Sequence, residues 1–190
     1  MHILCRSFSG DKPKMTSALI KKAAKKSNKD IMVVGVGNRL LGDEGIGLYI
    51  IDNLSQIPMP SNVNFIDCGC DLLDLMSYLN KPKKIIIIDA IRGGGKPGEI
   101  YRFNYSKLPT TKDETQSGHQ IGTIDVLRLL KSVYPVLADS EIILIGVEPK
   151  MLELSTDLSQ EVKERIADVT RLVIEEISPQ SSFWREGEKT

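Results

Sequence analysis

The sequence predicts a three-layer α/β domain with a mostly parallel sheet. Short apolar runs alternate along the chain with segments whose apolar residues recur every three or four positions, as strands alternate with helices in this fold class. Residues 84–90 contain four consecutive isoleucines, a composition typical of a central strand that is buried on both faces. With 190 residues, of which 41% are hydrophobic, the chain has the size and composition of a single globular domain.

The expected elements follow one another in a regular order. The predicted strands are residues 31–34, 63–66, 84–90, 99–103 and 141–149. The period-two alternation of residues 99–103 indicates an edge strand. The predicted helices follow Gly47, run briefly over residues 72–79, cover residues 124–133 and extend from an N-cap at Ser159 to Ile177.

Charge distinguishes the first 30 residues from the rest of the chain. Residues 1–30 hold eight of the 25 basic residues and two of the 25 acidic ones, so the remainder has a net charge of −6. We expect residues 1–30 to form a flexible basic extension, residues 31–178 a single domain and residues 179–190 a loose tail. The sequence lacks a run of the ~20 apolar residues that a membrane span needs, and its three cysteines favour a reducing cytoplasm over a disulfide framework.

Acidic residues gather where predicted strands end. Asp43 and Glu44 lie in a glycine-rich loop after the first strand, and Asp89 ends the isoleucine-rich strand. Parallel strands place their carboxyl ends at one edge of the sheet, where open α/β folds build their sites. His119 precedes a predicted helix on a loop. Such a set could bind a divalent ion such as zinc or nickel, or could perform general acid–base chemistry.

Other chemistries have weaker signals. Ser117 lies near His119, but the sequence has no Gly-x-Ser-x-Gly nucleophile elbow. Cys68 and Cys70 have no second cysteine pair with which to complete a zinc site. The Gly35–Gly37 segment lacks the third glycine of a dinucleotide fingerprint, and the two acidic residues that follow would repel a phosphate.

The motifs together resemble those of the hydrogenase maturation endopeptidases. The matching residues are Gly35-Val36-Gly37-Asn38, Leu40, Asp43-Glu44-Gly45-Ile46-Gly47, Asp89-Ala90, Ser117-x-His119 and Gly146-Val147-Glu148-Pro149, with Leu158-Ser159 before the final helix. The resemblance extends from Ile31 to Ile177. It implies a twisted five-stranded sheet flanked by helices, of the phosphorylase/hydrolase-like type.

The resemblance also implies an activity. Family members remove a C-terminal extension from the large-subunit precursor of a nickel-iron hydrogenase after nickel has been inserted. The metal-contacting and catalytic positions of the family fall on Glu44, Asp89 and His119, while Asp43, Asn38 and Asp67 take supporting roles. Nickel is expected to arrive with the precursor, and cadmium or zinc could occupy the same position. We expect a cytoplasmic monomer that binds no nucleic acid.

Two other functions remain open at this level. The chain could be another metal-dependent hydrolase that acts on a small amide, or a non-enzymatic nickel-binding chaperone of hydrogenase assembly. One departure from the family pattern is Asp67-Cys68-Gly69-Cys70, where family members usually have Asp-Gly-Gly-Thr. Because this segment bears on substrate choice in the family, the sequence leaves the identity of the hydrogenase open.

Overall fold

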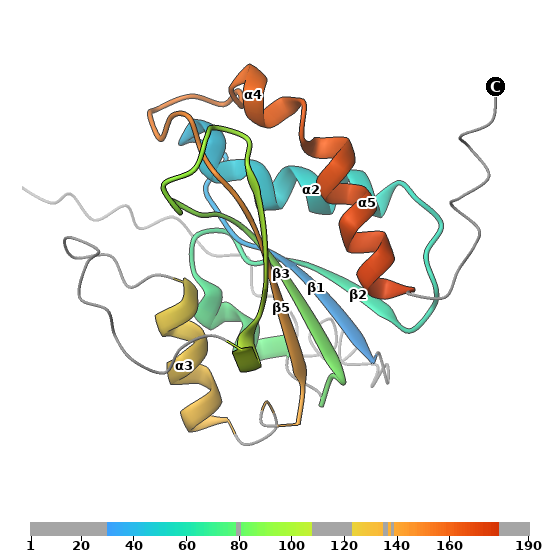
Figure 1. Ribbon diagram of the computed structural model, residues 1–190. Coiled ribbons are helices and arrows are strands. Elements are labelled where there is room, and N and C mark those ends of the chain that lie inside the picture. Colours follow the sequence, from blue (N-terminus) through green and yellow to red (C-terminus); the bar gives the residue numbers. More distant parts are fainter. Residues whose placement is uncertain (1–29, 79–80, 108–122, 135–136, 138, 179–190) are drawn as a thin grey trace, which may run out of the picture.

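A computed structural model describes residues 30–78, 81–107, 123–134, 137 and 139–178. The predicted extension up to residue 29, the tail over residues 179–190 and the loop containing Ser117 and His119 lie outside these ranges. Five strands form one sheet in the order β2-β1-β3-β5-β4 (Figure 1). The strands are β1 (Ile31–Gly35), β2 (Val63–Asp67), β3 (Lys84–Ala90), β4 (Ile100–Asn104) and β5 (Glu141–Val147).

The sheet is mostly parallel, as the sequence predicts. Strands β2, β1, β3 and β5 run in one direction, and β4 pairs antiparallel with β5 at the edge. In β3, the side chains of Ile85, Ile86, Ile87 and Ile88 are all fully buried. These isoleucines alternate between two separate cores, one on each face of the sheet. Burial on both faces explains why the strand has no polar positions in its middle.

Helices cover both faces and complete the three layers (Figure 1). One face is covered by α2 (Ile46–Ser55) and α5 (Ile166–Ile177), whose apolar residues share a core with Ile86 and Ile88. The other face is covered by α3 (Thr123–Val133) and the 3-10 helix η2 (Leu72–Tyr78), which pack on Ile85 and Ile87. Both the fold class and the order of the predicted elements are therefore confirmed.

Two details of the helices go beyond the sequence prediction. The short helix predicted over residues 72–79 is confirmed, and it is a 3-10 helix over Leu72–Tyr78. The last helix is divided into α4 (Gln160–Lys163) and α5, with a break at Glu164 and Arg165. Its apolar positions still face one core, because Val162, Val169 and Val173 are fully buried on the same side of the sheet. Apolar spacing predicts the buried face correctly, but it does not show where the backbone hydrogen bonds are interrupted.

Close backbone contacts hold the loop after β1 at the carboxyl edge of the sheet. Gly37 has a φ of +139°, and a Cβ atom there would lie 1.8 Å from the carbonyl oxygen of Glu44. A Cβ atom on Gly47 would lie 2.4 Å from the carbonyl oxygens of Ile88 and Val36. Only glycine fits at these positions. The glycines therefore allow the acidic loop to sit directly against the ends of β1 and β3.

Candidate active site

The acidic loop is a short 3-10 helix, η1 (Gly42–Gly45), that continues into α2. Its two adjacent carboxylates have different environments. The Asp43 side chain is fully buried, whereas that of Glu44 is only partly buried. Neighbouring residues on a tight turn point in different directions, so Asp43 faces the protein interior and Glu44 faces the sheet edge.

The Asp43 carboxylate accepts four hydrogen bonds. The Lys150 and Met151 amides donate to Oδ2 at 2.8 and 3.0 Å, the Ser159 amide donates to Oδ1 at 2.6 Å, and the Ser159 hydroxyl donates to Oδ2 at 2.8 Å. Four donors fill the acceptor capacity of a carboxylate, so the Asp43 side chain is committed to these contacts. Asp43 therefore fastens η1 to the segment between β5 and α4.

The last helix begins at the predicted position, but the Ser159 side chain makes a different contact from the predicted cap. Ser159 occupies the N-cap position of α4, but its side chain makes no capping hydrogen bond. Its hydroxyl donates to Asp43 instead. The sequence identifies Ser159 as a polar residue before a helix, but it does not reveal a partner 116 positions earlier.

The Glu44 carboxylate is unlike its neighbour. Among the described residues, no hydrogen-bond donor and no basic side chain contacts its oxygens. The charge on Glu44 is close enough to Asp89 to raise the pKa of that residue. The two carboxylates thus lie near each other at the carboxyl edge of the sheet, as the parallel arrangement of β1 and β3 predicts.

Asp89, at the end of β3, is partly buried. The hydroxyl of Thr123, the first residue of α3, donates to its Oδ2, and the Ala90 amide also donates to the carboxylate. Burial, with a smaller contribution from the charge of Glu44, raises the pKa of Asp89 from 3.8 to about 6, although both hydrogen bonds oppose this shift. A carboxyl with a raised pKa beside a second acid is typical of a site that binds a cation or transfers a proton.

The described residues do not by themselves form the predicted metal-binding set. They include no cluster of three His, Cys, Asp or Glu side chains arranged around one ion. His119, the predicted nitrogen ligand, lies outside the described ranges. Glu44 and Asp89 provide two oxygen donors, which suit a borderline divalent ion when an imidazole completes the set.

Comparisons with known proteins place the chain in a family. Residues 48–176 match the family described as HycI, hydrogenase maturation protease. The chain belongs to the hydrogenase maturation protease family. The matched range extends from α2 to the last turn of α5.

Individual relatives agree with this assignment. The hydrogenase 2 maturation protease of Escherichia coli is 32% identical over 148 residues, which cover 76% of this chain and 88% of that protein. The solved structure of the [NiFe] hydrogenase maturation protease HybD from Thermococcus kodakarensis has 32% identity and a TM-score of 0.63, covering 77% of this chain and 98% of that one. The hydrogenase 2 maturation peptidase of Thaumarchaeota archaeon SCGC_AB-539-E09 has 31% identity and a TM-score of 0.59, with coverages of 79% and 99%.

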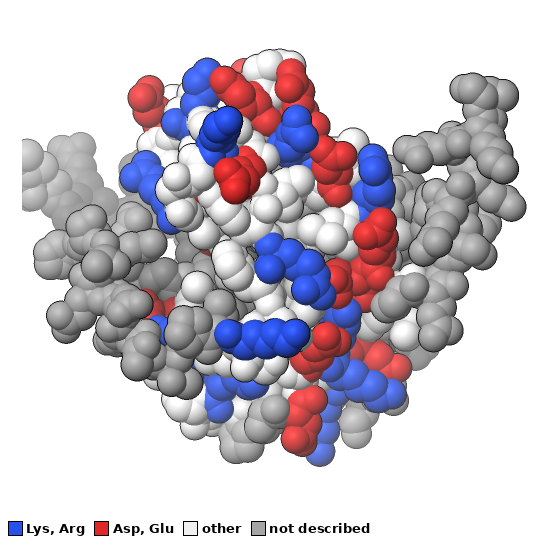
Figure 2. Space-filling view, in the orientation of Figure 1, with Lys and Arg blue, Asp and Glu red and all other residues white. Residues whose placement is uncertain are grey.

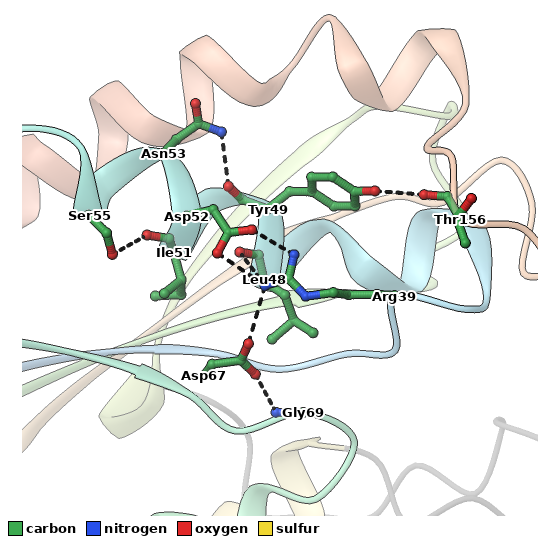
Figure 3. Close-up of polar contacts among 10 residues, drawn as sticks. All are labelled: Arg39, Leu48, Tyr49, Ile51, Asp52, Asn53, Ser55, Asp67, Gly69 and Thr156. Atoms are coloured by element: carbon green, nitrogen blue, oxygen red, sulfur yellow. Dashed lines mark hydrogen bonds and ion pairs between the residues drawn. The ribbon is translucent and has the colours of Figure 1, made fainter.

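Two further predicted residues of this maturation protease, Asn38 and Asp67, make hydrogen bonds in the loops that follow β1 and β2, and Figure 3 shows Asp67. Asn38 accepts a hydrogen bond from the Leu40 amide at 3.0 Å and so stabilises the turn that leads to Glu44. Asp67, which ends β2, accepts a hydrogen bond from the Gly69 amide at 2.9 Å and pairs with Arg39 at 3.2 Å. Both contacts shape loops at the carboxyl edge of the sheet.

Arg39 is a residue that the sequence analysis did not single out. Its guanidinium donates to Asp52 of α2 at 2.7 and 3.1 Å, pairs with Asp67 and lies over the Tyr49 ring (Figure 3). Arg39 thus forms two ion pairs, one with Asp52 and one with Asp67. Since all three side chains are exposed, each pair stabilises the fold only weakly. The contacts nevertheless connect the loop after β1 to the segment after β2. An arginine in a loop gives no sequence signal for such partners.

Glu148 is a second residue that the sequence analysis assigned no role. Its side chain is buried, and its Oε2 accepts hydrogen bonds from the Gly93 amide at 2.7 Å, the Tyr101 hydroxyl at 2.7 Å and the Gly95 amide at 3.3 Å. Although burial raises the pKa of Glu148, these donors lower it below its ordinary value overall. Glu148 therefore fixes the glycine loop that follows Asp89.

The two described cysteines are free, one buried and one exposed. Burial, together with the charges of Asp74, Asp67 and Asp71, raises the pKa of the Cys68 thiol to about 11. A thiol with so high a pKa is a poor nucleophile near neutral pH. Cys68 is therefore unsuited to covalent catalysis.

The distribution of charged side chains on the surface indicates which partners the protein can bind. On the face shown in Figure 2, the basic side chains are interspersed with acidic ones. The described part of that face thus has no continuous basic surface of the kind that nucleic-acid binding requires. None of the described helices combines the length and hydropathy of a membrane span.

Proposed function

We propose that this maturation protease removes a C-terminal extension from the large-subunit precursor of a [NiFe] hydrogenase after nickel has been inserted. The names of the relatives describe maturation proteases of hydrogenases, in some cases explicitly of [NiFe] hydrogenases. The observation that carries the proposal is the Glu44 carboxylate, which has no partner among the described residues and lies near Asp89 at the sheet edge.

In this proposal nickel belongs to the substrate. Glu44 and Asp89 contact the ion through oxygen and His119 contacts it through nitrogen, a donor set that suits nickel. Since the described residues offer Glu44 no hydrogen-bond donor or cation, its carboxylate is available to an incoming metal. An ion held between enzyme and precursor can polarise the scissile carbonyl or activate a water molecule.

The proposal gives the neighbouring residues supporting roles. Asp43 holds η1 in place through its four donors, and Asn38 and Asp67 shape the adjoining loops. We further infer that the protein works as a monomer in the cytoplasm, with which the free thiols of Cys68 and Cys70 are consistent.

The test is incubation of the purified protein with nickel-loaded precursor, followed by measurement of the mass of the large subunit. His119→Ala is compared with His2→Ala, which replaces the only other histidine of the chain. We expect the wild-type protein and His2→Ala to release a C-terminal fragment, and His119→Ala to leave the precursor intact.

Other outcomes would contradict the proposal. Binding of the precursor without a change in its mass would indicate an assembly chaperone. Turnover of generic peptides or small amides, without a requirement for the precursor, would indicate another hydrolase on the same fold.

A further inference from the structure

The first residue of α3 contacts the carboxylate that ends β3. Thr123 donates its hydroxyl hydrogen to Oδ2 of Asp89, 34 positions earlier in the sequence. Helix N-cap side chains act as hydrogen-bond acceptors for backbone amides. Here the hydroxyl donates to a carboxylate, so this contact serves Asp89 and is not a helix cap.

The position of Thr123 is fixed by the helix to which it belongs. Leu127 and Leu130 lie on the inner face of α3 and are 0% and 1% exposed. They share a core with Ile85 and Ile87, the strand residues that lead to Asp89. Because the helix and the strand pack on the same core, the hydroxyl is held at a constant place relative to the carboxylate. β-Branching further limits the rotamers of Thr123.

The contact distinguishes the two acids of the candidate site. The Asp89 carboxylate has two described donors, the Thr123 hydroxyl and the Ala90 amide, whereas the Glu44 carboxylate has none. An ionised carboxylate can accept about four hydrogen bonds, so Asp89 retains acceptor capacity for a cation. Hydrogen bonds to a metal-binding carboxylate orient it and tune its affinity.

We propose that Thr123 is a positioning residue that orients the Asp89 carboxylate toward the metal ion of the precursor. The inference rests on the proposed function, because it takes Asp89 as a nickel-contacting residue. Thr123 itself touches neither the metal nor the peptide. Its effect on processing passes entirely through the hydrogen bond to Asp89.

Three substitutions isolate this hydrogen bond. Thr123→Val keeps the shape and the β-branching but removes the donor, Thr123→Ser keeps the donor, and Thr123→Ala is a second donor-free variant. We expect processing of nickel-loaded precursor to be about tenfold slower for the Val and Ala variants, the effect of losing one hydrogen bond to a charged group. We expect Thr123→Ser to remain within about twofold of the wild-type protein.

A second readout does not depend on activity. Cadmium, a surrogate divalent ion, is titrated calorimetrically into the protein alone. We expect Thr123→Val to bind it about five- to tenfold more weakly and Thr123→Ser to restore the affinity. A merely structural role would change the melting temperature of Thr123→Val and leave both the cadmium affinity and the processing rate of the folded protein unchanged.

Failure of this inference can be distinguished from failure of the proposed function. If Asp89→Asn abolishes processing while Thr123→Val and Thr123→Ala match the wild-type protein, the positioning role is wrong and the proposed function stands. If Asp89→Asn processes the precursor normally, or if the wild-type protein does not bind cadmium, the assignment of Asp89 as a metal-contacting residue is wrong, and the inference falls with it.

Discussion

The two ends of the central strand place carboxylates in opposite settings. Near the start of β3, the Glu176 carboxylate pairs with Lys84 and Arg102, each at 2.6 Å. At the end of the same strand, the Asp89 and Glu44 carboxylates lie near each other, and no described cation pairs with either. Although burial raises the pKa of Glu176, its two cationic donors lower it overall, whereas burial and Glu44 raise the pKa of Asp89.

This difference distinguishes a carboxylate that stabilises the fold, Glu176, from the two that the proposal assigns to function, Asp89 and Glu44. A neutralised carboxylate at one end contributes to folding, while two neighbouring carboxylates without a cationic partner among the described residues oppose it at the other end. Proteins keep such uncompensated charge where a ligand will neutralise it. In the proposed function, that ligand is the nickel ion of the precursor.

The largest expected effect is on Glu44. Glu44→Gln removes the charge without changing the shape, and we expect processing to fall at least about 100-fold because the metal loses a direct contact. The melting temperature should stay near that of the wild-type protein, since no described donor depends on this carboxylate. Glu153→Gln, an exposed glutamate in the segment between β5 and α4, is the matched control. Rapid processing by Glu44→Gln would contradict the assignment.

The next effect concerns Asp43. In Asp43→Asn an amide group would face some of the four donors that now converge on the carboxylate. We expect the free energy of unfolding in urea to fall by about 3 kcal/mol. Asp157→Asn, an exposed change in the same segment, should alter it by less than about 0.5 kcal/mol. Equal stability of the two variants would show that the Asp43 contacts contribute little.

A smaller effect is expected at the paired end of the strand. Glu176→Gln leaves Lys84, whose side chain is 14% exposed, without its closest anion. We expect a loss of about 1–2 kcal/mol of unfolding free energy, with normal processing by the folded protein. Because the pKa of Glu176 is lowered, its stabilisation is present above its ordinary pKa of 4.5 and is lost as the pH falls through the value in the folded protein.

The control for this variant is its exposed neighbour, Glu175→Gln, which should change neither stability nor processing. If Glu176→Gln slowed processing in the folded protein, the separation between a structural and a functional end of β3 would be wrong.

The smallest effect is a gain in stability. Asp89 has a raised pKa, so its ionised form is disfavoured in the folded protein, and this penalty is fully present above about pH 6. We expect Asp89→Asn to increase the unfolding free energy of the protein alone by about 1 kcal/mol near pH 8, an amount reduced by the partial exposure of the side chain. The gain should disappear as the pH falls toward the ordinary pKa of 3.8, where Asp89 is protonated.

Urea unfolding at the two pH values measures this difference. A loss of stability near pH 8 on changing Asp89→Asn would mean that the carboxylate is compensated in the folded protein. The comparison between the two ends of β3 would then have no energetic basis.

The pattern of apolar residues in the sequence predicts the part of the site that lies at the ends of the strands. The apolar runs identify β1 and β3, and their parallel direction places Glu44 and Asp89 at one edge. The acidic residues lie in a predicted glycine-rich loop, and the structure shows a close approach of backbone segments at Gly37 and Gly47. These inferences succeed because burial and strand direction are recorded locally in the residue pattern.

Contacts between distant polar residues could not be predicted in the same way. Nothing near Ser159 indicates that it donates to Asp43, and nothing near Thr123 indicates that it donates to Asp89. The division of α4 from α5 and the 3-10 geometry of η2 likewise depend on tertiary packing, which can override local helical preference. The positions of the candidate acids were therefore predictable, but the side chains that hold them were not.

The most direct test of the account compares nickel-loaded with nickel-free precursor. Both forms are incubated with the wild-type protein, and the mass of the large subunit is followed over time. Since Glu44 and Asp89 have no cationic partner in the described part of the chain, we expect rapid removal of the C-terminal extension from the nickel-loaded form alone. Equal cleavage of the nickel-free form would contradict the central claim, because the two carboxylates would then have no metal ion to meet.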